Sequence, residues 1–360
     1  MSYDKSKPYN ELPVLPPKPD VWENLEVYKI LTEARAAMAE LKGRAPIIPN
    51  PKMLINTLVL QEAKDSSSIE NVYTSNDKLY RAFSAGSPDS DPQTKEVLRY
   101  RQALWEAWQE MQKDSWNLEL MEKVYRTIKE KEDGVRTEGV YIGGGGTVVY
   151  TPPLGRDVLL EKLGNWFEFA DSADDIDSLI KMAILHYQFE AIHPFTDGNG
   201  RTGRVLNVLY LSRRGLLDLP ILYLSKYINE HKNDYYKLLL DVTEKNAWKP
   251  WICYMLTAVS ETASFTLGKV NAIHDLHKQI VAKVKAEAPK IYTHELVEIL
   301  FHQPYCRIGI LVEAQIATRN TASKYLNELA DLGVLTRQEH GKEVLYLNHA
   351  LLKILESNAQ

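Results

Sequence analysis

The apolar residues of this chain recur mostly at every third or fourth position, which is the spacing of one face of an α-helix. Tyr28, Leu31, Ala34, Met38 and Leu41 form the first such face. The same spacing predicts helices over residues 25–41, 52–64, 94–112, 117–130, 156–170, 175–190 and 201–213. The last of these segments is apolar almost all round, so we expect it at the centre of the fold.

Two stretches interrupt this helical pattern. Residues 1–20 are rich in proline, which predicts an extended arm that is wrapped on the surface or partly disordered. The β-prone residues 140–142 and 147–150 are joined by four glycines, which predicts a β-hairpin. A plain connector between helices is the alternative that this pattern leaves open.

The pattern changes again after residue 290. We expect three short helices over 292–301, 306–314 and 318–332, and then strands at 334–337 and 344–347. Helices followed by a hairpin in this order are typical of a winged helix. With Lys283–Pro289 as connector, the chain divides into an N-terminal arm and helical region over 1–110, a helical core over 111–285 and a winged-helix domain over 290–360. The predicted fold class is therefore mainly α.

Composition narrows the function classes. The 360 residues carry a net charge of −5, so the whole chain is not an electrostatic binder of nucleic acid. Two cysteines argue against a disulfide scaffold or a cysteine-based zinc site. No apolar stretch approaches the roughly 20 residues of a membrane span, and the N-terminus lacks the apolar segment of a signal peptide. We therefore expect a cytoplasmic protein with no membrane contact.

The expected winged helix gives little support to DNA binding. Residues 290–347 carry six basic and seven acidic side chains. Release of counterions from DNA therefore contributes little affinity to this region. Binding of a protein, or support of a homodimer, is at least as good an interpretation of this domain.

The run from His193 to Arg204, HPFTDGNGRTGR, concentrates the residues that phosphate chemistry needs. Gly198 and Gly200 let an anion approach the backbone N–H groups. The following helix directs its free N–H donors and positive dipole end to the same place. Arg201 and Arg204 lie three positions apart, so both can face a bound phosphate.

The remaining polar residues of this run complete the chemistry. Asp197 can hold a Mg²⁺ ion that bridges phosphates, and Asn199 can donate to a phosphate oxygen. His193 can take a proton near neutral pH. The pattern predicts attack of a hydroxyl on a phosphate of a magnesium-bound nucleotide. A zinc site of His186, Glu190 and His193 is the weaker alternative, because their spacing is not that of His-Glu-x-x-His.

This run resembles the signature of the Fic family, His-Pro-Phe-x-Asp/Glu-Gly-Asn-Gly-Arg-x-x-Arg, at every specified position. The resemblance implies a Fic helical core and a protein adenylyltransferase, which transfers AMP from ATP to a Ser, Thr or Tyr hydroxyl of a protein, itself included. It also implies site roles. His193 is then the base, Asp197 the Mg²⁺ ligand, and Gly198 to Gly200 bind the α- and β-phosphates. Arg201 and Arg204 bind the outer phosphates.

Three further segments are similar to the family. The hairpin resembles its flap, which would align a target strand along Val140, Tyr141, Ile142 and Gly143. Tyr235, Tyr236 and Thr243 resemble the residues that border the nucleotide, although the two tyrosines also suit a plain core. Ser66 to Asn71 fits the inhibitory pattern Ser/Thr-x-x-x-Glu-Gly/Asn, which implies that Glu70 pairs with Arg204 and blocks the γ-phosphate. Without the resemblance, Glu70 would be read as a surface acid.

Two other functions stay open. One is a different Fic chemistry, such as transfer of another phosphate-linked group, or removal of AMP with Glu70 positioning a water. The other is a nucleotide-sensing regulator in which the pocket controls the winged helix.

Overall fold

A computed structural model describes residues 3–85, 90–113, 116–144, 146–340 and 343–357. The helices are α1 (Leu25–Arg44), α2 (Pro51–Ile69), α3 (Asn76–Ala85), α4 (Pro92–Met111), α5 (Leu118–Lys129), α6 (Arg156–Asp171), α7 (Ser178–Ile192), α8 (Asn199–Arg213), α9 (Leu224–Glu230), α10 (Lys232–Lys245), α11 (Trp248–Glu287), α12 (His294–Ile299), α13 (Ile308–Glu313), α14 (Arg319–Asp331) and α15 (His349–Glu356). The strands are β1 (Ile142–Gly144), β2 (Thr147–Tyr150), β3 (Tyr305–Cys306), β4 (Thr336–His340) and β5 (Glu343–Leu347). The predicted mainly helical fold is confirmed.

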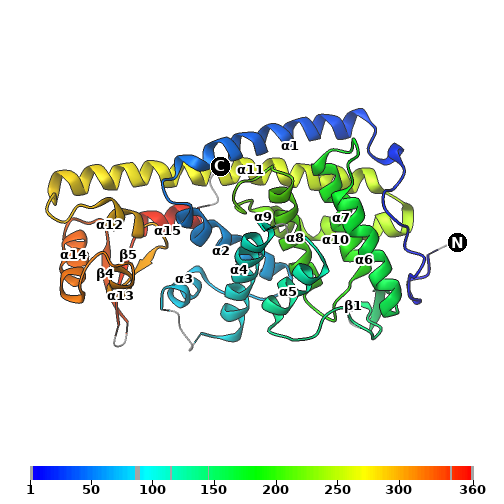
Figure 1. Cartoon of the computed structure of the whole chain (residues 1–360), viewed down its shortest axis with the longest axis horizontal. Coiled ribbons are helices and arrows are strands. Elements are labelled where there is room, and N and C mark those ends of the chain that lie inside the picture. The colour runs from blue at the N-terminus through cyan, green and yellow to red at the C-terminus, as the bar shows by residue number, and fades with distance from the viewer. Residues whose placement is uncertain (1–2, 86–89, 114–115, 145, 341–342, 358–360) are drawn as a thin grey trace.

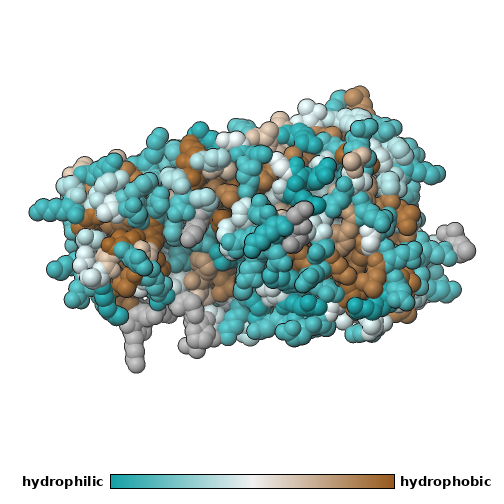
Figure 2. Space-filling view, viewed as in Figure 1, coloured by the Kyte–Doolittle hydropathy of each residue, from teal (hydrophilic) through white to brown (hydrophobic). Residues whose placement is uncertain are grey.

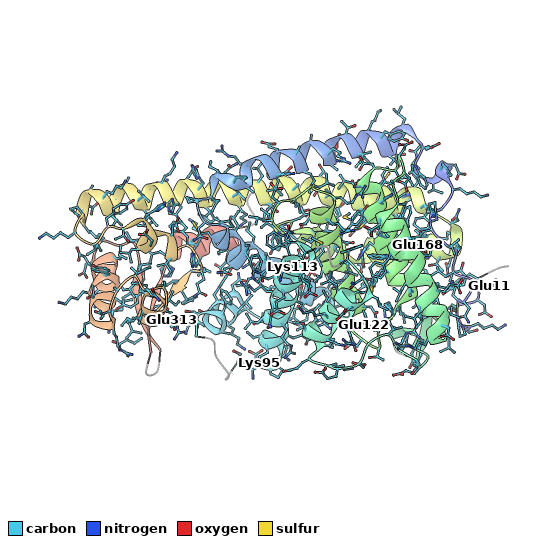
Figure 3. All side chains as sticks on the ribbon, in the orientation of Figure 1. Glu11, Lys95, Lys113, Glu122, Glu168 and Glu313 are labelled. Atoms are coloured by element: carbon cyan, nitrogen blue, oxygen red, sulfur yellow. The ribbon has the colours of Figure 1, made fainter. Side chains whose placement is uncertain are left out.

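The molecule is elongated, and α11 runs along its whole length beside α1 (Figure 1). The other helices of the core lie on one side of this pair. At the centre, α7 and α8 pack against each other and bury almost every side chain, as the apolar pattern of residues 201–213 predicts. Exposed carboxylates such as Glu168 on α6 and Glu313 on α13 project outward (Figure 3).

The proline-rich arm lies against the core instead of hanging free. Leu12 and Leu15 are buried. The Tyr9 N–H donates to the Thr151 carbonyl at 3.1 Å, next to β2, and the Gln188 side chain of α7 donates to the Pro13 carbonyl at 2.8 Å. The arm therefore fastens the base of the hairpin to α7.

The hairpin is present, but its first strand differs from the prediction. β1 begins at Ile142 and runs into the glycines, whereas we expected a strand over residues 140–142. A bulge separates Ile142 from Gly143, and Gly143 pairs with Val148. A Cβ atom at residue 143 would lie 2.0 Å from the Thr147 carbonyl oxygen, so the close pairing requires glycine here.

The C-terminal region contains the three expected helices and the hairpin, together with the additional strand β3. Its sheet has the order β3-β5-β4, and all pairs are antiparallel. The connector is shorter than predicted, because α11 continues through residues 283–287 and ends at Glu287. The sequence pattern also missed α3, which has only ten residues, and it gave no prediction for α9, α10, α11 or α15.

Polar side chains cover most of the face seen in Figure 2, with smaller apolar areas over the C-terminal region and near α6. Within the described ranges, no helix combines the length and apolar character needed to cross a membrane.

Candidate active site

The loop between α7 and α8 owes its shape to two left-handed residues. His193 ends α7 with φ 49°, and its N–H donates to the Phe189 carbonyl at 3.0 Å. Gly198 precedes α8 with φ 74°. Because the chain turns sharply at both residues, the six residues 193–198 bring the end of one buried helix to the start of the other.

Asn199 braces this loop with its side chain. Its Oδ1 accepts from the Phe195 N–H at 2.9 Å, and its Nδ2 donates to the Phe195 carbonyl at 2.8 Å. Phe195 is stacked on Tyr125 with 4.1 Å between the ring centroids. One N–H of the Asn199 amide is therefore used inside the loop, and donation to a phosphate by its second N–H stays a prediction.

The start of α8 has unpaired backbone donors. The N–H groups of residues 199–201 have no hydrogen-bond acceptor among the described residues, whereas the Thr202 N–H donates to the Gly198 carbonyl at 3.0 Å. Three unpaired donors at the positive end of a helix dipole favour a bound phosphate.

His193 has the protonation state of a base at neutral pH. Its Nδ1 lies 3.3 Å from the Glu190 carbonyl oxygen, so an Nδ1–H donating there leaves Nε2 as an acceptor. Burial, with help from the Arg136 guanidinium, lowers the pKa of His193 to about 4. The imidazole is therefore neutral at pH 7.

Arg136 holds the loop from the side of the hairpin. It is buried, and its Nε donates to the His193 carbonyl at 2.8 Å. Its two terminal nitrogens donate to the carbonyls of Glu138 and Pro153 at 2.8 and 2.7 Å. Sequence reasoning missed this residue, because a single arginine beside a predicted hairpin carries no signal of its partners.

The predicted inhibitory pair is formed. Arg204 is 1% exposed, and its Nη2 lies 2.9 Å from Glu70 Oε1. Its Nε donates to Ser66 Oγ at 2.8 Å, and Nη2 also donates to the Ser66 carbonyl at 2.9 Å. Glu70 lies so close to the loop that a Cβ atom at Gly200 would be 2.3 Å from its Oε1. The absence of a side chain at Gly200 therefore leaves the space that the Glu70 carboxylate occupies.

Asn71 explains the last position of the inhibitory pattern. It follows α2 with φ 62°, a left-handed conformation that glycine and asparagine tolerate best. The Val72 N–H then donates to the Ser67 carbonyl at 3.0 Å and closes the end of the helix. This turn sets the direction in which Glu70 leaves α2, so Asn71 acts through the backbone.

A cavity of about 400 Å³ opens beside the loop. The predicted site residues that line it are Glu70, Ile142, Gly143, His193, Gly200, Arg204, Tyr235, Tyr236 and Thr243. Those outside its lining are Ser66, Asn71, Val140, Tyr141, Asp197, Gly198, Asn199 and Arg201. The cavity thus joins the base, the inhibitory pair, the hairpin and the start of α8.

The two tyrosines of α10 differ in their surroundings. Tyr236 is 43% exposed at the cavity. Tyr235 is buried, and its hydroxyl lies 2.8 Å from His186 Nε2, so it also serves the core. Thr243 Oγ1 lies 2.9 Å from the hydroxyl of Tyr187, another cavity residue.

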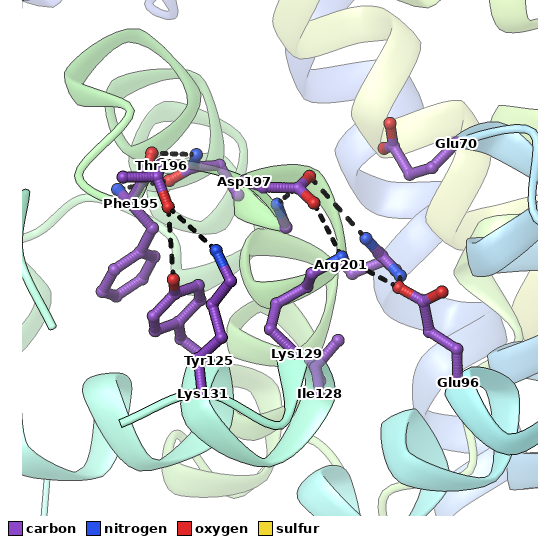
Figure 4. Close-up of polar contacts among 12 residues, drawn as sticks. Glu70, Glu96, Tyr125, Ile128, Lys129, Lys131, Phe195, Thr196, Asp197 and Arg201 are labelled. Carbon is purple, nitrogen blue, oxygen red and sulfur yellow. Dashed lines mark hydrogen bonds and ion pairs between the residues drawn. The ribbon is translucent and has the colours of Figure 1, made fainter. Parts of the chain in front are cut away.

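Asp197 and Arg201 are engaged in an ion-pair cluster (Figure 4). Asp197 Oδ2 lies 2.7 Å from Lys129 Nζ, which lies 3.0 Å from Glu96 Oε1. Glu96 also pairs with Arg201, which is 3% exposed. Sequence reasoning missed Glu96 and Lys129, because neither stands near a motif in the sequence.

The donor set suits a magnesium ion that arrives with a nucleotide. In the described part of the chain, no three His, Cys, Asp or Glu side chains are grouped closely enough to hold a metal by themselves. Mg²⁺ is commonly bound through one or two carboxylates together with substrate phosphates. The exposed carboxylate of Asp197, next to the unpaired N–H groups at the start of α8, fits that arrangement.

Three family descriptions match successive parts of this chain. Residues 28–109 match "Fic/DOC family N-terminal", residues 111–211 match "Fic/DOC family", and residues 276–351 match "Protein adenylyltransferase SoFic-like, C-terminal domain". The last two matches fall on the predicted catalytic core and C-terminal domain.

Curated relatives share the central part of the chain. Protein adenylyltransferase Fic of Drosophila mojavensis is 28% identical over 174 residues, which is 48% of this chain and 32% of the relative. A probable protein adenylyltransferase of Aquifex aeolicus is 30% identical over 137 residues, 38% of this chain and 41% of the relative. The chain therefore spans about a third of the length of the first relative and two fifths of the second.

Solved structures share the fold. A Fic family protein from Desulfovibrio desulfuricans G20 superposes with a TM-score of 0.55 at 18% identity, covering 93% of this chain and 98% of that one. Fic-1 from C. elegans gives 0.53 at 20% identity, covering 68% and 74%. Together with the matched sequence segments, these findings show that the chain belongs to the Fic/DOC family.

Proposed function

We propose that this protein transfers AMP from ATP to a Ser, Thr or Tyr hydroxyl of a protein, itself included, with release of pyrophosphate. The observation that carries the proposal is the shared cavity. A neutral histidine, the glycine at the start of α8 and an arginine paired with a carboxylate all line it. The names of the matched relatives, which are adenylyltransferases, support the same reaction.

The residues of the chain divide the chemistry among them. His193 accepts the proton of the target hydroxyl through Nε2, because Nδ1 faces the Glu190 carbonyl. The open N–H groups of residues 199–201 stabilise negative charge on the phosphates. Arg204 supplies a further positive charge once Glu70 has left it. Asp197 would hold Mg²⁺, which neutralises phosphate charge when it is bound.

Glu70 would hold the site in a resting state. Its carboxylate occupies the space next to Gly200 and pairs with Arg204, so outer phosphates cannot use that arginine. A hydrogen bond to a charged group contributes about 1.5–3 kcal/mol, which corresponds to roughly ten- to hundredfold suppression of productive ATP binding.

Transfer from ATP labelled at the α-phosphate tests both parts of the proposal. We expect His193→Ala to abolish labelling of the protein and Glu70→Gly to raise it roughly ten- to hundredfold. Glu130→Gly is the control for the same change of residue type, because Glu130 also directly follows a helix but contacts Arg99 instead of the loop. Full labelling by His193→Ala would refute the mechanism, and equal labelling by the two glycine variants would refute inhibition by Glu70.

Removal of AMP is the second candidate activity. Glu70 is 31% exposed and shares the cavity with His193, so its carboxylate could orient a water there. Release of AMP from labelled protein by the wild type, and its loss in Glu70→Gly, would separate removal from transfer.

Ile142 and Gly143 of the hairpin line the cavity and support target docking, whereas Tyr141 is 71% exposed outside it.

The order α12-β3-α13-α14-β4-β5 supports a winged helix at the C-terminus. We propose it as a docking domain for protein, because its charges are balanced. DNA binding, a homodimer and a cytoplasmic location stay predictions.

A further inference from the structure

We propose that Lys129 is a third phosphate-binding cation of this site, held by Glu96 beside Arg201 and released from Asp197 when a metal-bound polyphosphate arrives. The inference rests on the proposed function and names a residue for the pyrophosphate part of ATP. Lys129 lies outside the signature run, at the last position of α5, 68 residues before Asp197.

Lys129 lies against the phosphate loop along its whole side chain. A Cβ atom at Gly198 would be 2.9 Å from Lys129 Cδ and 3.0 Å from its Cγ, so the methylene groups cover the Cα atom of Gly198. The ammonium group ends 2.7 Å from Asp197 Oδ2. The lysine side chain is only 15% exposed, because its stem packs on the loop.

Glu96 gathers two cations at this end of the loop. It pairs with the Arg201 guanidinium, and its Oε1 lies 3.0 Å from Lys129 Nζ (Figure 4). Burial opposes ionisation of Glu96, but the hydrogen bonds and charges of Arg201 and Lys129 outweigh it and keep the pKa of Glu96 below its ordinary value. Glu96 is therefore a positioning residue that holds both cations next to the open amides of α8.

The charges predict how Lys129 moves. Lys129 and Arg201 are balanced by Glu96 and Asp197, so the cluster is neutral before a ligand binds. A divalent cation on Asp197 replaces the ammonium group as its partner and repels it. The nearest new anion is then a polyphosphate on the N–H groups of residues 199–201. A lysine carries three donors at the end of a flexible stem, so its ammonium group can turn from Asp197 to a phosphate oxygen.

Lys129 therefore has opposite effects on two ligands. It competes with a metal ion alone for Asp197, and it assists a metal-bound pyrophosphate. Its removal should tighten binding of the first and weaken binding of the second. If Lys129 only stabilised the fold, its substitution would change the affinities for the metal ion and for the metal-bound pyrophosphate in the same direction, or would change neither of them.

Calorimetry on the full chain tests this, with Glu70→Gly as the parent because Arg204 is then free. In Lys129→Met we expect binding of Mg-pyrophosphate to weaken roughly tenfold, the loss of one charge-assisted hydrogen bond. Binding of Mn²⁺ alone should tighten about two- to fivefold, the size of an exposed ion pair. Binding of AMP, which lacks the outer phosphates, should stay the same.

Lys131→Met is the matched control. Lys131 lies two positions further, and its Nζ lies 3.5 Å from Thr196 Oγ1 of the same loop, so it carries the same charge without touching Asp197. We expect the control to leave all three affinities unchanged. Lys129→Arg keeps the charge and should retain pyrophosphate affinity within about threefold, which shows that the position tolerates a change of side chain.

Unchanged pyrophosphate affinity in Lys129→Met, or an equal loss in Lys131→Met, would overturn the inference. The inference would also be overturned if neither the Glu70→Gly parent nor any of its lysine variants bound Mg-pyrophosphate. The proposed function is tested separately, by transfer of labelled AMP.

Discussion

The two neighbouring serines of α2 allow a sharp test of how the inhibitory helix is held. Ser66 Oγ accepts a hydrogen bond from Arg204 Nε at 2.8 Å. Ser67 Oγ is also buried, but it has no hydrogen-bond partner among the described residues. Replacing each serine by alanine therefore removes the same atom from the same helix, and only one of the two changes breaks a bond to a charge.

The magnitude follows from the surroundings of Arg204. Its side chain is 1% exposed, and its Nη1 already lacks a partner in the described structure, so loss of the Ser66 hydroxyl leaves a second unpaired donor on a buried charge. A hydrogen bond to a charged group contributes about 1.5–3 kcal/mol, and we expect Ser66→Ala to lower the free energy of unfolding by that amount. For Ser67→Ala we expect a change of no more than about 0.5 kcal/mol, because the change leaves no partner unsatisfied.

Urea unfolding followed by tryptophan fluorescence measures both free energies. The slopes of the two unfolding curves should be equal, so that the difference in midpoint reports stability alone. Equal losses in Ser66→Ala and Ser67→Ala would refute the reasoning, because the cost would then come from removing a hydroxyl from α2 and not from the arginine.

Three further predictions concern the loop and its floor. Asn199→Ala should lower the free energy of unfolding by about 2–3 kcal/mol in urea, because two hydrogen bonds to Phe195 are lost; a loss below about 0.5 kcal/mol would contradict the bracing role. In a double-mutant cycle, Gly200→Ala should lower the free energy of unfolding of the wild type by at least about 1 kcal/mol more than it lowers that of the Glu70→Gly variant, because the new Cβ atom collides with Glu70. Additive effects of the two mutations would argue against that contact. Burial raises the pKa of Glu190 to about 8, so its contribution to stability is complete below its unfolded pKa of about 4.3 and is lost as the pH rises through 8. Stability measured from pH 5 to pH 9 should therefore fall in the wild type relative to Glu190→Gln, and parallel pH curves would contradict this.

The sequence allowed seven helices of the core and the central run to be predicted, because both are local, whereas α3, α9, α10 and α11 were not predicted. Periodicity reports which face of a helix is buried, and seven of the predicted helices appear within a few residues of their expected bounds. The Glu70–Arg204 pair is 134 residues apart, and only the family resemblance led to it. Glu96 and Arg201 are 105 residues apart, and no such pattern pointed to them.

What the sequence did not reveal has physical causes of the same kind. The motif gave Asn199 a phosphate to bind, but it gave no sign of the two hydrogen bonds by which its side chain holds the Phe195 backbone. The first strand was expected before the glycines, because β-propensity favours valine and isoleucine. The close approach of the Thr147 carbonyl requires a residue without Cβ, and that demand appears only when both strands are in place.

A single helix, α11, contacts both the wall of the cavity and the C-terminal region. Its 40 residues span about 60 Å as one unbroken rod. At its start, Trp248 packs on the cavity residue Tyr187 with 4.7 Å between ring centroids, and further along Lys269 donates to the carbonyls of Ile354 and Leu355 in the C-terminal helix. Binding of a partner to the C-terminal region would therefore act, through this one helix, on a side chain that lines the cavity.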